Sequence, residues 1–207
     1  MKTTRINTRK IVMTAMFAAI ASVLMFLNFN VPFMPSFIKF DFSELPALLA
    51  AYSLGPVSGV LVCLVKNAVN LPSTITGGVG ELSNFLLGCA FVLPAGLIYR
   101  WKKTRRAALL GAVIGTLSMA TIGIFTNYFV VYPIYMKIMP IETIVRMYQA
   151  IFPGVDGLLS CLLIFNFPFT LLKGAVNAAI SFLVYKRISP FIKGDKTKKE
   201  KKDGENA

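Results

Sequence analysis

Long apolar runs separated by short polar connections constrain this chain more than any other feature. The first run covers residues 11–29, and the last extends from about residue 155 to 186. A helix needs about 20 apolar residues to cross the hydrocarbon core of a bilayer. Hydrophobic residues make up 56% of the chain and charged residues only 15%, whereas roughly a quarter of a soluble domain is charged. The sequence therefore predicts an all-α integral membrane protein.

The order of runs and breaks predicts one membrane domain over residues 1–190, folded as a six-transmembrane-helix bundle. Gly55 and Pro56 end the second run, 45–55, which is too short to cross the hydrocarbon straight. The stretch 191–207 is charged and poor in apolar residues, so we expect a disordered tail there. The six helices are expected at residues 11–29, 45–55, 56–71, 81–101, 107–135 and 155–186.

Basic residues are concentrated on one side of this predicted bundle. Four Lys or Arg precede the first run, five lie between residues 100 and 106, and eight follow from Lys186 onward. The connections on the other side carry only Lys39, Lys137 and Arg146. Because cytoplasmic loops collect Lys and Arg, both termini are predicted to lie in the cytoplasm of a multi-pass cell-membrane protein. The chain has a net charge of +13, but its basic residues do not form a patch with interleaved aromatics. The expected partner is therefore the lipid bilayer and not nucleic acid.

Several kinds of chemistry are excluded by composition. The chain contains no histidine, and its three cysteines lie far apart inside apolar runs. This argues against His-based catalysis, a metal site and a disulfide. The stretch "ITGGVGE" (75–81) lacks the GxxxxGK[ST] spacing of a phosphate-binding loop. We therefore expect no enzyme, no metal and no ATPase activity in this chain.

Two lysines, Lys66 and Lys173, lie inside apolar runs, where an ionisable residue usually marks a functional site. Asn166, Thr170, Lys173 and Asn177 follow an i, i+4, i+7, i+11 spacing, which places them on one face of a helix. Hydrogen bonding between helices is the alternative use of Asn and Thr. Lys173, however, needs a partner that its own helix does not supply. The pattern favours a face that lines a cavity.

Further polar residues are expected on the face opposite the basic segments. The stretch "KNAVNLPSTITGGVGELSNF" (66–85) surrounds a glycine-rich bend, and Glu81 begins the next helix, where the helix dipole favours a carboxylate. We interpret the mixed loop 30–44 as part of a lid. Asn127 lies deep in the fifth run among tyrosines, and an aromatic-lined cavity with a few polar groups is typical of a small-molecule site. The candidate ligand-binding residues are Asn127, Thr170, Lys173, Asn177, Lys66, Asn67, Glu81, Asn84, Lys39 and Asp41.

The first run also carries small residues at helical spacing. Ala15 and Ala19 form an AxxxA pair, and Ala18 and Ser22 continue the stripe. Such faces allow helices to approach closely. The stripe is a candidate partner interface, with packing inside the bundle as the alternative.

Three stretches together resemble a known family. They are "KFDFSELPALLAAYSLGPVSGVLVCLVKNAVN" (39–70), "TGGVGELSNFLLGCAFVLPAGLIY" (76–99) and "FPFTLLKGAVN" (167–177). In this order they resemble the riboflavin-binding S components of energy-coupling factor (ECF) vitamin transporters, over about residues 9–190. The resemblance implies a six-helix subunit of a prokaryotic plasma membrane. Such a subunit captures a vitamin from outside and delivers it inward with a transmembrane coupling protein and two cytoplasmic ATPases.

The resemblance also implies roles for particular residues. Flavin contacts would fall on Asn127, Thr170 and Lys173, and Ala15 and Ala19 would contact the coupling protein. Thr170 stands where several relatives carry Asn and offers one hydroxyl in place of an amide. The ligand would be riboflavin, with FMN or roseoflavin as alternatives, and no separate cofactor. An S component for another vitamin, or a secondary transporter acting alone, stays open as an alternative function.

Overall fold

Helices make up nearly all of the regular structure, which is given by a computed structural model that describes residues 8–193 and the side chains of residues 8–184. The tail expected from residue 191 lies outside the described residues from position 194 onward. The longer helices are α1 (Thr8–Phe26), α2 (Glu44–Leu54), α3 (Pro56–Asn70), α4 (Val79–Trp101), α5 (Arg105–Thr126) and α9 (Phe167–Lys193). The shorter elements are β1 (Phe29–Asn30), β2 (Lys39–Phe40), η1 (Leu71–Ser73), η2 (Asn127–Val131), α6 (Tyr132–Tyr135), α7 (Ile141–Gln149), α8 (Leu158–Cys161) and η3 (Leu162–Asn166).

Four helical stretches in the described part of the chain are long and apolar enough to cross a membrane. Two of them are composite, because the π-helical turns η2 and η3 join α5 to α6 and α8 to α9. Helices α2 and α3 have only 11 and 15 residues. The predicted helical membrane character is thus confirmed. The four stretches are Thr8–Phe26, Val79–Trp101, Arg105–Tyr135 and Leu158–Val184.

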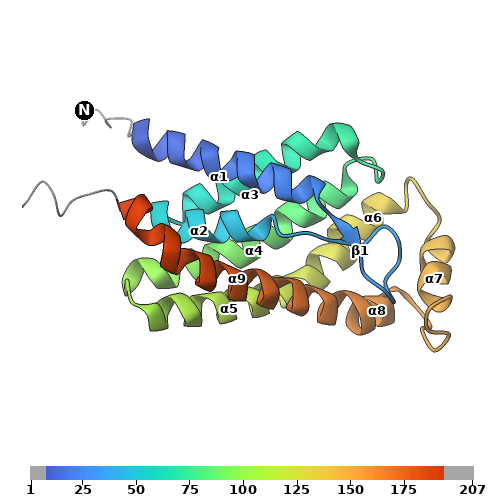
Figure 1. Cartoon of the computed structure of the whole chain (residues 1–207). Helices are drawn as coiled ribbons and strands as arrows, with labels where there is room; N and C mark the ends of the chain where they lie inside the picture. Colours follow the sequence, from blue (N-terminus) through green and yellow to red (C-terminus); the bar gives the residue numbers. More distant parts are fainter. Residues whose placement is uncertain (1–7, 194–207) are drawn as a thin grey trace, which may run out of the picture.

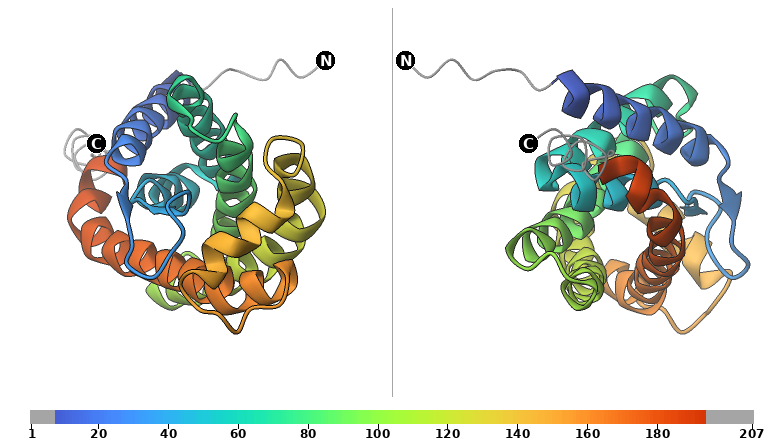
Figure 2. Two further views of the ribbon diagram at one scale, coloured as in Figure 1. Left: turned by 90° about the vertical axis from the view of Figure 1, so that its right-hand side faces the viewer. Right: turned by 60° about the vertical axis from the view of Figure 1, so that its left-hand side comes forward.

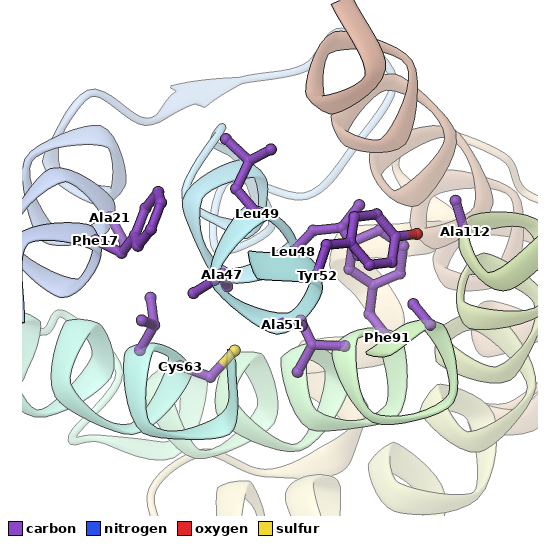
Figure 3. Close-up of a cluster of buried hydrophobic side chains, with 14 of the residues drawn as sticks. Phe17, Ala21, Ala47, Leu48, Leu49, Ala51, Tyr52, Cys63, Phe91 and Ala112 are labelled. Atoms are coloured by element: carbon purple, nitrogen blue, oxygen red, sulfur yellow. The ribbon is translucent and has the colours of Figure 1, made fainter. Parts of the chain in front are cut away.

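The short helix α2 forms the centre of the hydrophobic core. Its six consecutive residues 47–52 each expose 8% of their surface or less, so this helix is enclosed on every side. Figure 2 shows α2 inside a ring formed by the longer helices. Leu48 and Tyr52 lie beside Phe91 of α4 (Figure 3), and the Tyr52 hydroxyl donates to the Ala108 carbonyl oxygen of α5 at 2.8 Å. A helix packed in this way contacts protein in place of lipid and need not be long.

The two ends of the bundle differ in character. The beginning of α1, the α4–α5 connection and the end of α9 lie together at one end (Figure 1). We call this the basic end, because residues 100–106 there include five Lys or Arg. The other end holds η1, α7 and the strands, and we call it the hairpin end.

Except for Phe29, which ends the first apolar run, the strands and α7 occupy stretches that the apolar runs leave unassigned. β1 pairs antiparallel with β2, with Phe29 opposite Phe40 and Asn30 opposite Lys39. This small hairpin is a departure from the all-α prediction. It holds the loop between α1 and α2 across the hairpin end.

The backbones of α4 and α5 approach unusually closely. A Cβ atom at Gly115 would lie 2.5 Å from the Phe91 carbonyl oxygen, and one at Gly111 would lie 2.8 Å from that of Ala95. Glycines spaced four residues apart allow this contact between helices inside a membrane. Any side chain at these two positions would push the helices apart.

We predict that Gly115→Leu destabilises the protein by about 1–3 kcal/mol, the usual cost of overpacking a close contact. Val113→Leu is the control, since Val113 lies two residues away on α5 and is 50% exposed. Thermal unfolding of the detergent-solubilised protein should show a lower midpoint for Gly115→Leu alone. Equal midpoints for the two variants would contradict this packing.

Candidate functional site

A cavity of about 240 Å³ lies at the hairpin end of the bundle. Its apolar wall comes from Met25, Phe37, Leu87, Tyr132 and Phe169, among others. Its polar lining comes from the loop before α2, the η1 bend and the helices α4, α5 and α9 with their π-turns. The charged and amide side chains that line it are Asn28, Lys39, Asp41, Asn70, Glu81, Asn84, Asn127, Asn166 and Lys173.

Lys173 of α9 is neutralised by Asp41, which lies in the loop between β2 and α2. The Lys173 Nζ is 2.8 Å from Asp41 Oδ2 and also donates to Asn84 Oδ1 at 3.3 Å. Burial alone would raise the pKa of the Asp41 carboxyl, but the nearby Lys173 and Lys66 ammonium groups and the Ser43 hydrogen bond lower it to about 2. Asp41 therefore stays ionised at neutral pH. The stability that it contributes is lost as the pH falls from about 4 toward 2.

Lys66 of α3 forms a second ion pair deeper in the bundle. Its Nζ is 2.6 Å from Glu44 Oε1 and also donates to Ser43 Oγ at 2.6 Å. Both side chains of the ion pair are fully buried. A buried lysine of this kind is costly unless its charge is paired and its donors are satisfied, and both conditions are met here.

One hydroxyl connects the two ion pairs. Ser43 Oγ donates to Asp41 Oδ1 and accepts from Lys66, and the Ser43 backbone N–H also donates to Asp41 Oδ1 at 2.9 Å. The residues of segment 41–44 thus reach α9 through Asp41 and α3 through Glu44. This chain of contacts fixes the loop before α2 against two helices that are distant in sequence.

Glu81 closes the glycine-rich bend between η1 and α4. Its carboxylate accepts hydrogen bonds from Asn70 Nδ2 at 3.0 Å, Thr74 Oγ1 at 2.7 Å and Thr76 Oγ1 at 3.4 Å. Gly77 and Gly78 have φ angles of 62° and 87°, a region that glycine enters without strain. The bend is therefore ordered by Glu81 and permitted by the two glycines.

Two π-turns bring amide side chains to the cavity wall. Asn127 begins η2 and accepts from Ser83 Oγ at 2.9 Å, and Asn166 ends η3. π-turns interrupt the regular spacing of a helix and often occur at functional sites. Here each turn places an amide on the wall of the cavity.

Tyr148 of α7 joins parts of the wall together. Its hydroxyl lies 2.7 Å from the Tyr132 hydroxyl and donates to Asn166 Oδ1 at 2.7 Å. The ring of Phe37, from the loop before α2, meets Tyr148 edge to face with 6.0 Å between centroids. Tyr148 is not recognisable as a site residue from the sequence, because one tyrosine in a short amphipathic helix carries no signal of burial.

Comparison with known proteins assigns the chain to a family. The family model described as "ECF transporter, substrate-specific component" matches residues 9–185. The chain belongs to this family.

This S component is similar to proteins named riboflavin transporters and to a solved structure. Riboflavin transporter RibU of Staphylococcus aureus (strain TCH60) is 35% identical over 185 residues, which cover 89% of this chain and 93% of the relative. Riboflavin transporter FmnP of Bacillus subtilis (strain 168) is 28% identical over 189 residues, which cover 89% and 94%. A solved structure of the S component of a bacterial ECF transporter superposes with a TM-score of 0.72 at 33% identity, over 91% of this chain and 100% of that one.

In this S component the ten predicted ligand-binding residues divide into two groups. Lys66 is fully buried against Glu44, Asn67 donates to the Cys63 carbonyl oxygen at 2.7 Å, and Asn177 donates to the Lys173 carbonyl oxygen at 2.9 Å. These three are buried and do not belong to the cavity lining. The seven that line the cavity are Lys39, Asp41, Glu81, Asn84, Asn127, Thr170 and Lys173.

The small-residue stripe of α1 also divides into two buried and two exposed residues. Ala18 and Ser22 are buried, whereas Ala15 and Ala19 are exposed. All four lie along a largely apolar groove between α1 and α3, together with Val57, Leu61 and Val65. Packing inside the bundle thus accounts for half of the stripe and leaves the AxxxA pair on the surface.

We predict that breaking the buried ion pair destabilises the protein far more than removing both charges. Lys66→Met or Glu44→Gln alone should cost about 3–5 kcal/mol, because each leaves one buried charge unpaired. The double variant should recover much of this loss. Thermal unfolding in detergent measures the three variants, and a double variant as unstable as the sum of the two single ones would contradict the pairing.

Proposed function

We propose that this protein is the riboflavin-binding subunit of an ECF-type vitamin uptake transporter. It would capture flavin at the outer face and deliver it inward with a coupling protein and two ATPases. The observation that carries the proposal is the cavity at the hairpin end, in a family member whose relatives at 35% and 28% identity are named riboflavin transporters. Its own role is binding, without catalysis or a separate cofactor.

The chemistry of the cavity suits a flavin. The isoalloxazine ring is flat, with apolar faces and a polar edge, and the ribityl chain carries hydroxyls. Phe and Tyr side chains offer the apolar contacts, while Asn127, Thr170 and Lys173 offer donors and acceptors. At about 240 Å³, the cavity is somewhat smaller than the roughly 300–1,000 Å³ of typical ligand pockets. Flavin binding therefore requires movement, and we assign it to the part of loop 30–44 that precedes the fixed segment 41–44 and to the bend 71–80, acting as a lid.

The same proposal includes a membrane topology. One domain of six helices would lie in a prokaryotic plasma membrane, with both termini and the basic end in the cytoplasm. Support comes from the five Lys or Arg at residues 100–106 and from the positive-inside tendency. The hairpin end, with the cavity, would then face outward. Exposed Ala15 and Ala19, with Ala18 and Ser22 behind them, would dock the coupling protein.

Riboflavin should bind the detergent-purified protein at micromolar concentration or below, and its flavin fluorescence should be quenched on binding. Asn127→Ala and Thr170→Val should each weaken binding by about tenfold, the equivalent of one lost hydrogen bond of roughly 1.4 kcal/mol. Lys137→Ala is the control, because Lys137 is exposed and does not line the cavity. A wild type that shows no quenching contradicts the function, and two variants that bind like wild type contradict the site.

The lid assignment predicts that cross-linking its two parts blocks riboflavin uptake. Ile38→Cys and Ile75→Cys, which both line the cavity, would be introduced after Cys63, Cys89 and Cys161 are replaced by Ala. A bismaleimide should then block riboflavin uptake, while either single cysteine should leave it intact. Adding riboflavin before the cross-linker should trap it inside. Undiminished uptake by the cross-linked protein would contradict the lid.

A further inference from the structure

The charges around the cavity differ in how well they are compensated. Four charged side chains line it within the described part of the chain: Lys39, Asp41, Glu81 and Lys173. Asp41 and Lys173 neutralise each other at 2.8 Å. Lys39 is half-buried, whereas Glu81 exposes only 8% of its surface. The electrostatic effect of the cavity on a ligand therefore depends on the two remaining charges, those of Lys39 and Glu81.

Glu81 is buried without a cation beside it. The two buried ion pairs in the described part of the chain, Lys66–Glu44 and Lys173–Asp41, do not include Glu81. Its hydrogen-bond donors, Asn70, Thr74 and Thr76, are all neutral. They hold the carboxylate in place without cancelling its charge. A carboxylate has about four acceptor positions, so at least one is left for a donor on a ligand.

The two uncompensated charges act on a ligand with different strength. Water and salt screen an exposed charge much more than a buried one. An anionic group within about 10 Å of a buried carboxylate is repelled by more than thermal energy, even at an effective dielectric constant of about 20. Lys39 is closer to solvent, so its attraction compensates only part of this repulsion. Glu81 therefore opposes an anionic group that enters the cavity beside it.

We propose that Glu81 is a specificity-determining residue that makes the cavity favour an uncharged flavin over a flavin phosphate. This inference rests on the proposed function and concerns the same site. Riboflavin is uncharged, and its ribityl hydroxyls can donate to the free acceptor position of Glu81. The phosphate of FMN carries a charge of about −1.5 to −2 at neutral pH, and this charge would enter a cavity whose buried, unpaired charge has the same sign.

The test is the ratio of the Kd for FMN to the Kd for riboflavin, measured by fluorescence quenching. Glu81→Gln keeps the size and acceptor oxygen of the side chain and removes its charge. We expect this ratio to fall by at least about tenfold relative to wild type. Glu142→Gln is the matched control, because Glu142 is an exposed acid on α7 and its loss should leave the ratio unchanged.

A second variant tests the charge without removing the hydrogen bonds of Glu81. Ser73 lies in η1, is exposed and lines the cavity. Ser73→Lys should lower the ratio by offsetting the carboxylate, and Ser73→Gln should not. If Glu81→Gln fails to fold, the comparison of Ser73→Lys with Ser73→Gln still tests whether charge in the cavity sets the ratio. Unchanged ratios in Glu81→Gln and Ser73→Lys, with riboflavin binding intact in wild type, overturn this inference alone. A wild type that binds neither flavin overturns the proposed function as well.

Discussion

The buried contacts of segment 41–44 hold the rest of the site together. Asp41 and Glu44 lie three residues apart in sequence, yet each neutralises a lysine from a different helix, and Ser43 connects the two pairs. In a low-dielectric interior, each of these charges is tolerated only because its partner is present. The loop before α2 is therefore fixed to α3 and α9 at once. The cavity between this loop, α4 and α9 depends on that attachment.

The two membrane lysines illustrate how similar residues serve different purposes. Lys66 is fully buried and paired with Glu44, and Ser43 separates it from the cavity-lining Asp41. Lys173 shares its donors between Asp41 and Asn84 at the cavity wall, where a ligand could reach them. The cavity thus combines a compensated pair, an uncompensated carboxylate and amides placed by two π-turns. Such an arrangement suits an uncharged molecule with an apolar body and several hydrogen-bonding groups.

Part of this site was predictable from sequence, for a physical reason. Thr170, Lys173 and Asn177 share a buried face of α9, as their helical spacing predicts, whereas Asn166 lies just before this helix in η3 and is only partly buried. The apolar runs likewise predicted a helical membrane protein. Periodicity does not reveal which neighbour a helix face contacts, so Lys66 gave the same signal as Lys173, and Glu44 was not recognised as its partner. The hairpin and the buried position of Tyr148 depend on tertiary packing.

We expect a flavin to occupy the cavity beside Lys173 while the Lys66–Glu44 ion pair stays intact. A crystal structure of the protein with riboflavin tests this most directly. The isoalloxazine ring should lie inside the cavity, within hydrogen-bond distance of Asn127, Thr170 or Lys173, with Lys66 still bound to Glu44. A flavin bound elsewhere in the bundle, or one that contacts Lys66 in place of Glu44, would contradict it.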